Sequence, residues 1–174
     1  MAKKKSSKNN SLIVSGVTLL LGVLAFCLAG FLAAVKIGGA DSNSTLTGFQ
    51  SAFGYKETIG SGILSASVEI NKFNIMVTLG LFLPLIGGVL AIFKGKLFGF
   101  IALVAFVAGA VLLFLCPSLV KSTLSTAGIS DWLGGIFGTD ASVPTALGIG
   151  AILGGIFSIL GALAAAYKTF FLKK

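Results

Sequence analysis

The chain has no histidine and no arginine, and only 5 of its 174 residues are acidic. Enzymes and ion-coupled transporters in membranes need ionisable or metal-binding groups at depth, because such groups carry protons, bind cations or attack substrates. The sequence also has no CxxC pair and no glycine-rich phosphate loop followed by Lys and Ser/Thr. We therefore predict that the protein is not an enzyme, with no catalytic residue, cofactor-binding residue or metal ligand.

Cysteine is scarce too, since Cys27 and Cys116 are the only two. Both are expected in the same half of the membrane region, and a disulfide between them would require Cα atoms within about 7 Å of each other. Buried cysteines more often behave as small hydrophobic side chains. We interpret both cysteines as packing residues, although the sequence alone leaves their pairing open.

Charged residues of either sign make up 10% of the chain and hydrophobic residues 56%, whereas soluble domains carry about 25% charged residues. What the chain does contain is four uncharged runs, each longer than the roughly 20 residues that cross a bilayer core as a helix. These runs are Asn9–Val35, Phe73–Phe93, Leu97–Val120 and Ala141–Tyr167. The predicted fold class is an all-α membrane protein, a bundle of four transmembrane helices whose first partner is the lipid bilayer.

The expected organisation is one membrane domain between two short basic ends. Residues 1–11 form a basic tail, 12–171 the four-span domain and 172–174 a basic end. Within the domain the spans are expected at about 12–35, 73–93, 97–119 and 144–167. The loops that join them on one side of the membrane are 36–72 and 120–143.

The net charge of +8 follows the predicted topology and does not indicate binding to nucleic acid. Nine lysines fall on one side of the spans: Lys3, Lys4, Lys5, Lys8, Lys94, Lys96, Lys168, Lys173 and Lys174. The other four are Lys36, Lys56, Lys72 and Lys121. Because lysine is concentrated in cytoplasmic segments, the sequence predicts a multi-pass cell-membrane protein with both termini in the cytoplasm.

The loop at 36–72 is long for this chain, which makes it the leading candidate for a functional surface. Leu64, Ala66, Val68 and Ile70 alternate with polar residues, in the period of a half-buried strand. Such a strand needs a partner from the same loop, the other loop or a neighbouring molecule. The side chains expected to cover it and to make contacts there are Phe49, Phe53 and Tyr55.

Other residues are predicted to shape the spans themselves. Small residues that allow close helix crossings recur in the last span, at Gly150, Ala151, Gly154, Gly155 and Gly161. Whether their partner helix belongs to the same chain or to another copy is open at this stage. Pro84 predicts a kink in the second span, and Trp132 and Tyr167 are predicted to anchor the chain at the membrane interfaces.

Three functions fit these features. The first is a non-enzymatic tetraspan protein that acts in membrane-protein assembly or interaction, through its outer loops and glycine-faced helices, with another membrane protein or as a homo-oligomer. The second is an oligomeric channel, a holin-like pore or a transporter subunit. The third is a membrane protein of the bacteriocin-immunity type.

In outline, cytoplasmic termini with a large first and a smaller second outer loop are similar to tetraspan proteins such as the claudin group. That group has a Trp and a Gly-Leu-Trp followed by paired cysteines in its first outer loop. Residues 36–72 here contain neither tryptophan nor cysteine. The similarity is one of topology and implies no family membership.

Overall fold

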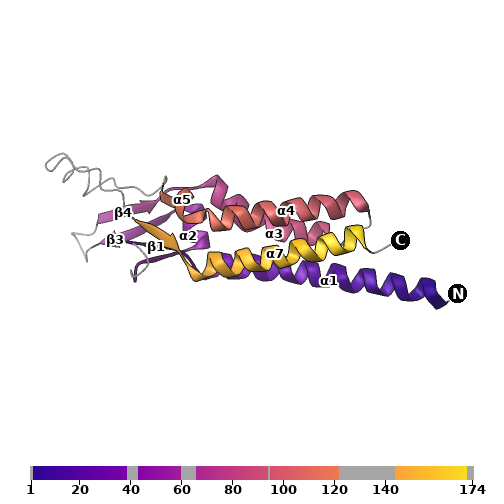
Figure 1. The fold of residues 1–174 in the computed structure, drawn as a ribbon. Helices are drawn as coiled ribbons and strands as arrows, with labels where there is room; N and C mark the ends of the chain where they lie inside the picture. The colour runs from indigo at the N-terminus through magenta and orange to yellow at the C-terminus, as the bar shows by residue number, and fades with distance from the viewer. Residues whose placement is uncertain (1, 39–42, 60–65, 94, 122–143, 172–174) are drawn as a thin grey trace.

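The computed structural model describes residues 2–38, 43–59, 66–93, 95–121 and 144–171. It is mostly helical, with three long apolar helices, a shorter apolar helix and a small amount of antiparallel sheet. In Figure 1 the helices run side by side, the strands gather at one end, and α1 begins and α7 ends at the other. We call these the cap end and the termini end.

The long helices of the described chain are α1 (Ala2–Phe31), α3 (Ile75–Leu90), α4 (Lys96–Phe114) and α7 (Ile149–Phe170). Three of them are long and apolar enough to cross a membrane: residues Ser11–Phe31 of α1, and the whole of α4 and α7. Helix α3 is apolar too but shorter, with 16 residues. Both α1 and α4 pack against α3 and against α7, which closes the four helices into a ring. Their outward side chains are largely apolar, as a multi-pass membrane protein requires.

The remaining elements lie at the cap end, and together we call them the cap (Figure 1). They are β1 (Ala33–Ile37), β2 (Thr45–Thr47), α2 (Gly48–Phe53), β3 (Tyr55–Ile59), β4 (Ala66–Asn71), α5 (Cys116–Lys121) and β5 (Thr145–Leu147). One antiparallel sheet has the order β2-β1-β5, and β3 pairs antiparallel with β4. In the three-stranded sheet, Val35 lies opposite Leu46 on one side and Leu147 on the other.

The strand predicted from the alternation in the first loop is confirmed, since β4 covers Ala66–Asn71. Its partner comes from the same loop, because Glu57 of β3 lies opposite Val68. The prediction was incomplete, however, since the loop also forms β1, β2 and the short helix α2. Most of the second loop, residues 122–143, lies outside the described residues, and Trp132 with it.

Two helices are shorter than the spans predicted for them. The span at 12–35 ends as a helix at Phe31, and the span at 144–167 becomes helical only at Ile149. The apolar residues left over form β1 and β5, which pair with each other. Their backbone groups therefore find hydrogen-bond partners without a helix, while Ala34 and Val35 are buried in the protein.

Two other boundaries differ because of local chemistry. Helix α1 extends back to Ala2, since a helix anchored by an apolar segment adds residues at little cost. The span at 97–119 divides at Leu115 into α4 and α5. Pro117 lacks a backbone N–H and clashes with a preceding turn, so it is tolerated near the start of a new helix rather than inside a long one.

Candidate functional site

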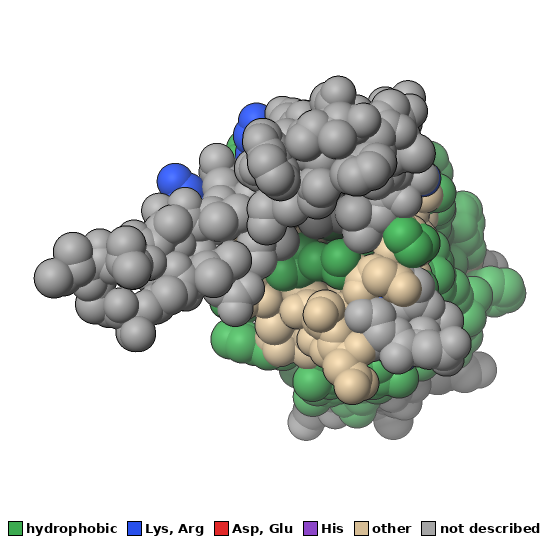
Figure 2. Space-filling view, turned by 90° about the vertical axis from the view of Figure 1, so that its left-hand side faces the viewer, with side chains coloured by type: hydrophobic (Ala, Val, Ile, Leu, Met, Phe, Trp, Pro, Cys, Tyr) green, Lys and Arg blue, Asp and Glu red, His purple; other side chains and the backbone are tan. Residues whose placement is uncertain are grey.

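The cap and the helix bundle share one hydrophobic core. Ala29 of α1, Leu81 of α3 and Leu113 of α4 are buried in the same cluster as Val35 of β1 and Leu46 of β2. Separating the cap from the helices would expose this apolar surface, which is unfavourable. The cap is therefore a fixed surface on the bundle. Figure 2, which looks onto the cap end, shows polar and backbone atoms towards its middle and hydrophobic side chains around them.

Hydrogen bonds between distant parts of the chain hold the sheet in place. Besides the β1–β5 ladder, the N–H of Gly38 donates to the carbonyl of Pro144 at 2.8 Å, and that of Gly148 donates to Ala34 at 2.8 Å. The hydroxyl of Thr145 donates to the carbonyl of Pro117 at 3.1 Å. The first loop is thus joined to the segment that leads into α7.

The carbonyl end of α2 is satisfied by protein groups. The side-chain amide of Asn71 donates to the carbonyls of Gln50 and Ser51, at 3.2 and 3.0 Å. The carbonyl of Ala52 accepts from the N–H of Asn74 at 2.8 Å and from the Thr78 hydroxyl at 3.5 Å. These bonds supply partners that a helix end otherwise takes from water.

Asn74 bonds to several elements of this junction. Its Oδ1 accepts from the N–H groups of Met76 and Val77, at 3.1 and 3.3 Å, and so caps the start of α3. Its Nδ2 donates to the carbonyl of Leu119 in α5 at 2.9 Å. The buried side chain of Asn74 therefore joins α3 to α5, and its backbone N–H joins them to α2.

At its other end α2 begins with a capping box. The N–H of Gln50 donates to Thr47 Oγ1 at 3.2 Å, and the N–H of Thr47 donates to Gln50 Oε1 at 2.9 Å. The next residue, Gly48, lies so close to α1 that a Cβ there would meet the Ala29 backbone carbonyl. Glycine at this position is what allows α2 to pack on α1.

Gly48→Ala is expected to lower the free energy of unfolding by about 1–3 kcal/mol, because backbone, unlike a flexible side chain, cannot move aside. The matched control is Gly16→Ala, where a Cβ has no heavy atom within 4 Å, and where alanine favours the helix by about 1 kcal/mol. Denaturant titrations in detergent micelles, followed by circular dichroism, compare the two. Equal stability of both variants would contradict the close α1–α2 contact.

The predicted contact residues Phe49 and Phe53 lie on α2 and join an aromatic cluster that continues into α1 and α3. Phe49 contacts Phe26 and Phe31 of α1, with ring centroids 5.5 and 5.1 Å apart. Phe53 lies 6.2 Å from Phe49 and 6.3 Å from Phe73. Phe49 and Phe53 therefore lie at the cap end of α1 and α3. Tyr55 begins β3 and packs against the shared core.

The predicted packing residues of α7 contact helices of the same chain. A Cβ at Gly150 would lie 2.9 Å from the Leu28 carbonyl, and one at Gly154 would lie 2.6 Å from Ala29 Cβ, both in α1. Gly150 and Gly154 thus face α1. Gly155 and Gly161 face α4, where they meet Phe114 and Phe106 respectively. Ala151 is fully buried. In the described structure, then, these glycines serve contacts within one chain.

Phe106 of α4 lies on the axis of the bundle and is completely buried. A Cβ at Gly22 of α1 would lie 3.3 Å from its ring, and one at Gly87 of α3 would lie 3.0 Å away; a Cβ at Gly161 of α7 would come closer still. Each of the other three helices thus places a glycine against this ring. The aromatic side chain fills the space in which a pore through one chain would run.

Two further predicted residues have clear positions. Helix α3 runs through Pro84, whose ring packs on α4, where a Cβ at Gly109 would lie 2.7 Å from it; the kink itself stays a prediction. Tyr167 is half exposed at the termini end and stacks on Phe171 at 5.7 Å. Nearby, the Lys168 ammonium donates to the carbonyls of Ala91 and Phe93, just beyond the end of α3.

The described residues contain no group of three or more side chains suited to a metal ion. Cys27 and Cys116 are both free thiols in the structure. Comparisons of the chain with protein-family models, with curated proteins and with solved structures find no match.

Proposed function

We propose that the protein is a non-enzymatic four-span protein of the cell membrane, whose cap binds another membrane protein or further copies of the same chain. The observation that carries this proposal is the single core shared by the cap and the helices. A surface of strands and short helices, held rigidly above a bundle, is preorganised for binding and loses little freedom when it binds.

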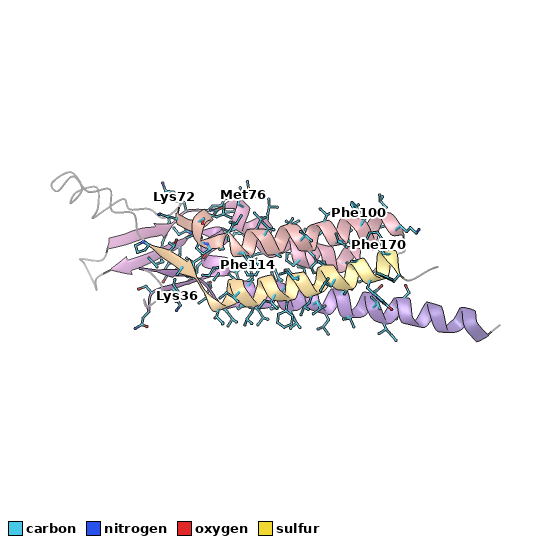
Figure 3. The ribbon with its side chains drawn as sticks, in the orientation of Figure 1. Lys36, Lys72, Met76, Phe100, Phe114 and Phe170 are labelled. Carbon is cyan, nitrogen blue, oxygen red and sulfur yellow. The ribbon has the colours of Figure 1, made fainter. Side chains whose placement is uncertain are left out.

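In the proposed arrangement the termini end faces the cytoplasm and the cap lies outside. Lys96 and Lys168 lie at the termini end, where cytoplasmic lysines are expected. Figure 3 shows Lys36 and Lys72 at the cap end and Phe100 and Phe170 towards the termini end. The apolar helix α3 serves as the fourth span in this proposal.

The channel, holin-like pore and transporter alternatives receive less support from the geometry. A conducting path needs polar groups or water along its length, and Phe106 instead fills the axis of the bundle. Any pore would then have to form between chains. The immunity-type alternative depends on a toxin, and we advance no observation in its favour.

A photo-crosslinking experiment in native membranes tests the proposal. A photoreactive amino acid replaces Lys56 or Lys72, which are exposed on the cap, or Lys96, which is exposed at the termini end and serves as the matched control. We expect a discrete adduct from the cap positions and none from Lys96. An adduct at twice the mass of the chain identifies a second copy, and any other mass identifies a different protein.

Failure to obtain an adduct from either cap position, with the protein correctly inserted, would contradict the proposal. Equal adducts from Lys96 and from the cap would also contradict it, because proximity would then not depend on the cap. Correct insertion is checked separately by protease protection of the two ends of the bundle.

A further inference from the structure

Helix α3 is shorter than its neighbours, and the missing length falls at the termini end, because Gly87, three residues before the last residue of α3, packs against Phe106, ten residues after the start of α4. Its 16 residues span about 24 Å, against a bilayer core of about 30 Å. At the termini end its last carbonyls lie beside Lys168, which sets the level of the interface there. At the cap end, by contrast, α3 begins at Ile75 beside α2 and α5, because Asn74 bonds to the carbonyls of Ala52 and Leu119.

The short helix α2 occupies the position above the start of α3. Hydrogen bonds from Asn71, Asn74 and Thr78 satisfy carbonyls at its end, and the capping box satisfies N–H groups at its beginning. A segment exposed to lipid must have its backbone polar groups satisfied inside the protein. The described bonds of α2 meet this requirement, so α2 is compatible with contact with the bilayer.

Three exposed phenylalanines surround α2 on its outer side, and we call them the aromatic patch. They are Phe31 at the end of α1, Phe53 at the end of α2 and Phe73 just before α3, with 69%, 52% and 56% of their surfaces exposed. Phe49 joins the first two, since its ring contacts both Phe31 and Phe53. Phe53 in turn contacts Phe73.

The aromatic patch continues into the surface that faces lipid. Ile75 and Met76, the first two residues of α3, are 53% and 48% exposed and are separated from Phe73 by Asn74 alone. Lys72 precedes it and is exposed, and in Figure 3 it lies farther towards the cap than Met76. A lysine next to an apolar surface places its stem along that surface and its charge at the level of the phosphates. Lys72, Phe73 and Ile75 therefore match three successive depths of the bilayer, which are the phosphates, the headgroup boundary and the acyl chains.

We propose that α2 is an interfacial helix, and that Phe31, Phe53 and Phe73 lie in the boundary between headgroups and acyl chains of the outer leaflet. The occupant of the aromatic patch is thus the lipid bilayer. This inference rests on the proposed four-span arrangement but requires no protein partner, so a failure of the crosslinking experiment leaves it standing.

Tryptophan fluorescence with depth-dependent quenchers tests this inference. In a Trp132→Phe background, the single tryptophan is introduced as Phe53→Trp or Phe73→Trp, with Lys56→Trp on β3 as the control. The full-length variants are reconstituted in phosphatidylcholine vesicles whose acyl chains carry bromine near the headgroup or near the bilayer centre.

We expect Phe53→Trp and Phe73→Trp to emit at shorter wavelength than Lys56→Trp and to lose most of their fluorescence to the shallow bromines. Quenching by the deep bromines should be weaker, and Lys56→Trp should be quenched by neither. Emission from both patch variants that matches Lys56→Trp would overturn the inference. Shallow quenching that disappears as the protein-to-lipid ratio rises would overturn it as well, because a second copy would then cover the patch.

Discussion

Phe106→Ala is expected to lower the free energy of unfolding by about 2–4 kcal/mol, for two reasons. The second of them does not apply to water-soluble proteins. Removing the ring leaves a cavity lined by Gly22, Gly87 and Gly161, none of which has a side chain that can move in to fill it. In addition, helices in lipid associate through packing rather than through a hydrophobic driving force, so lost van der Waals contacts are not compensated. Titration with sodium dodecyl sulfate in mixed micelles, followed by circular dichroism, measures the change.

The control for this prediction is Phe100→Ala on the same helix. Phe100 is 54% exposed, so lipid or detergent takes the place of its ring. We expect a change within about 0.5 kcal/mol for this variant. If Phe106→Ala were no more destabilising than Phe100→Ala, the ring would not be packed on the axis, and a pore within one chain would become the better interpretation.

Asn74→Ala is expected to lower the free energy of unfolding by about 2–4 kcal/mol, because it removes a helix cap and takes one donor from the partly buried Leu119 carbonyl. The side chain accepts from the N–H groups of Met76 and Val77 and donates to Leu119. Each of these groups lies where water is scarce, so replacement partners are costly to find. The same titration measures stability, and hydrogen exchange at Met76 and Val77 reports the local loss.

Two variants separate the contributions. Asn74→Asp keeps an acceptor for the cap but lacks the amide donor to Leu119, so its stability should fall between those of the natural chain and Asn74→Ala. Asn43→Ala, at an exposed asparagine, is the control and should change little. Unaltered exchange at Met76 and Val77 in Asn74→Ala would show that the cap does not hold the start of α3.

The helices could be predicted from the sequence because their signal is local. Long uncharged runs locate α1, α3, α4 and α7, and alternation locates β4. The helix ends differ from the predicted spans where a strand and a helix have the same composition. Ala33–Ile37 and Thr145–Leu147 are apolar enough to continue a span, and only their pairing with each other makes them strands. Periodicity in a short apolar segment cannot separate a buried strand from a helix.

The candidate site shows the same limit. Asn74 immediately precedes an apolar run, a sequence signal for a helix N-cap that could have identified it. No such signal marks Phe106, which is one of 15 phenylalanines, because the three glycines around it come from three other helices. Likewise the glycines of α7 were predicted to pack closely, but only the fold shows that α1 and α4 are their partners.

The ladder between β1 and β5 also imposes an order on biosynthesis. β1 leaves the ribosome directly after the first span, whereas β5 is made only just before the last one. At roughly 5–20 residues per second, β1 waits on the order of ten seconds for its partner. During that interval its edge on the β5 side and the α7-facing side of α1 are uncovered, so a chaperone or insertase that shields newly inserted spans has a defined substrate. Chains that terminate before Thr145 never complete the sheet, which gives membrane quality control a structural means of recognising them.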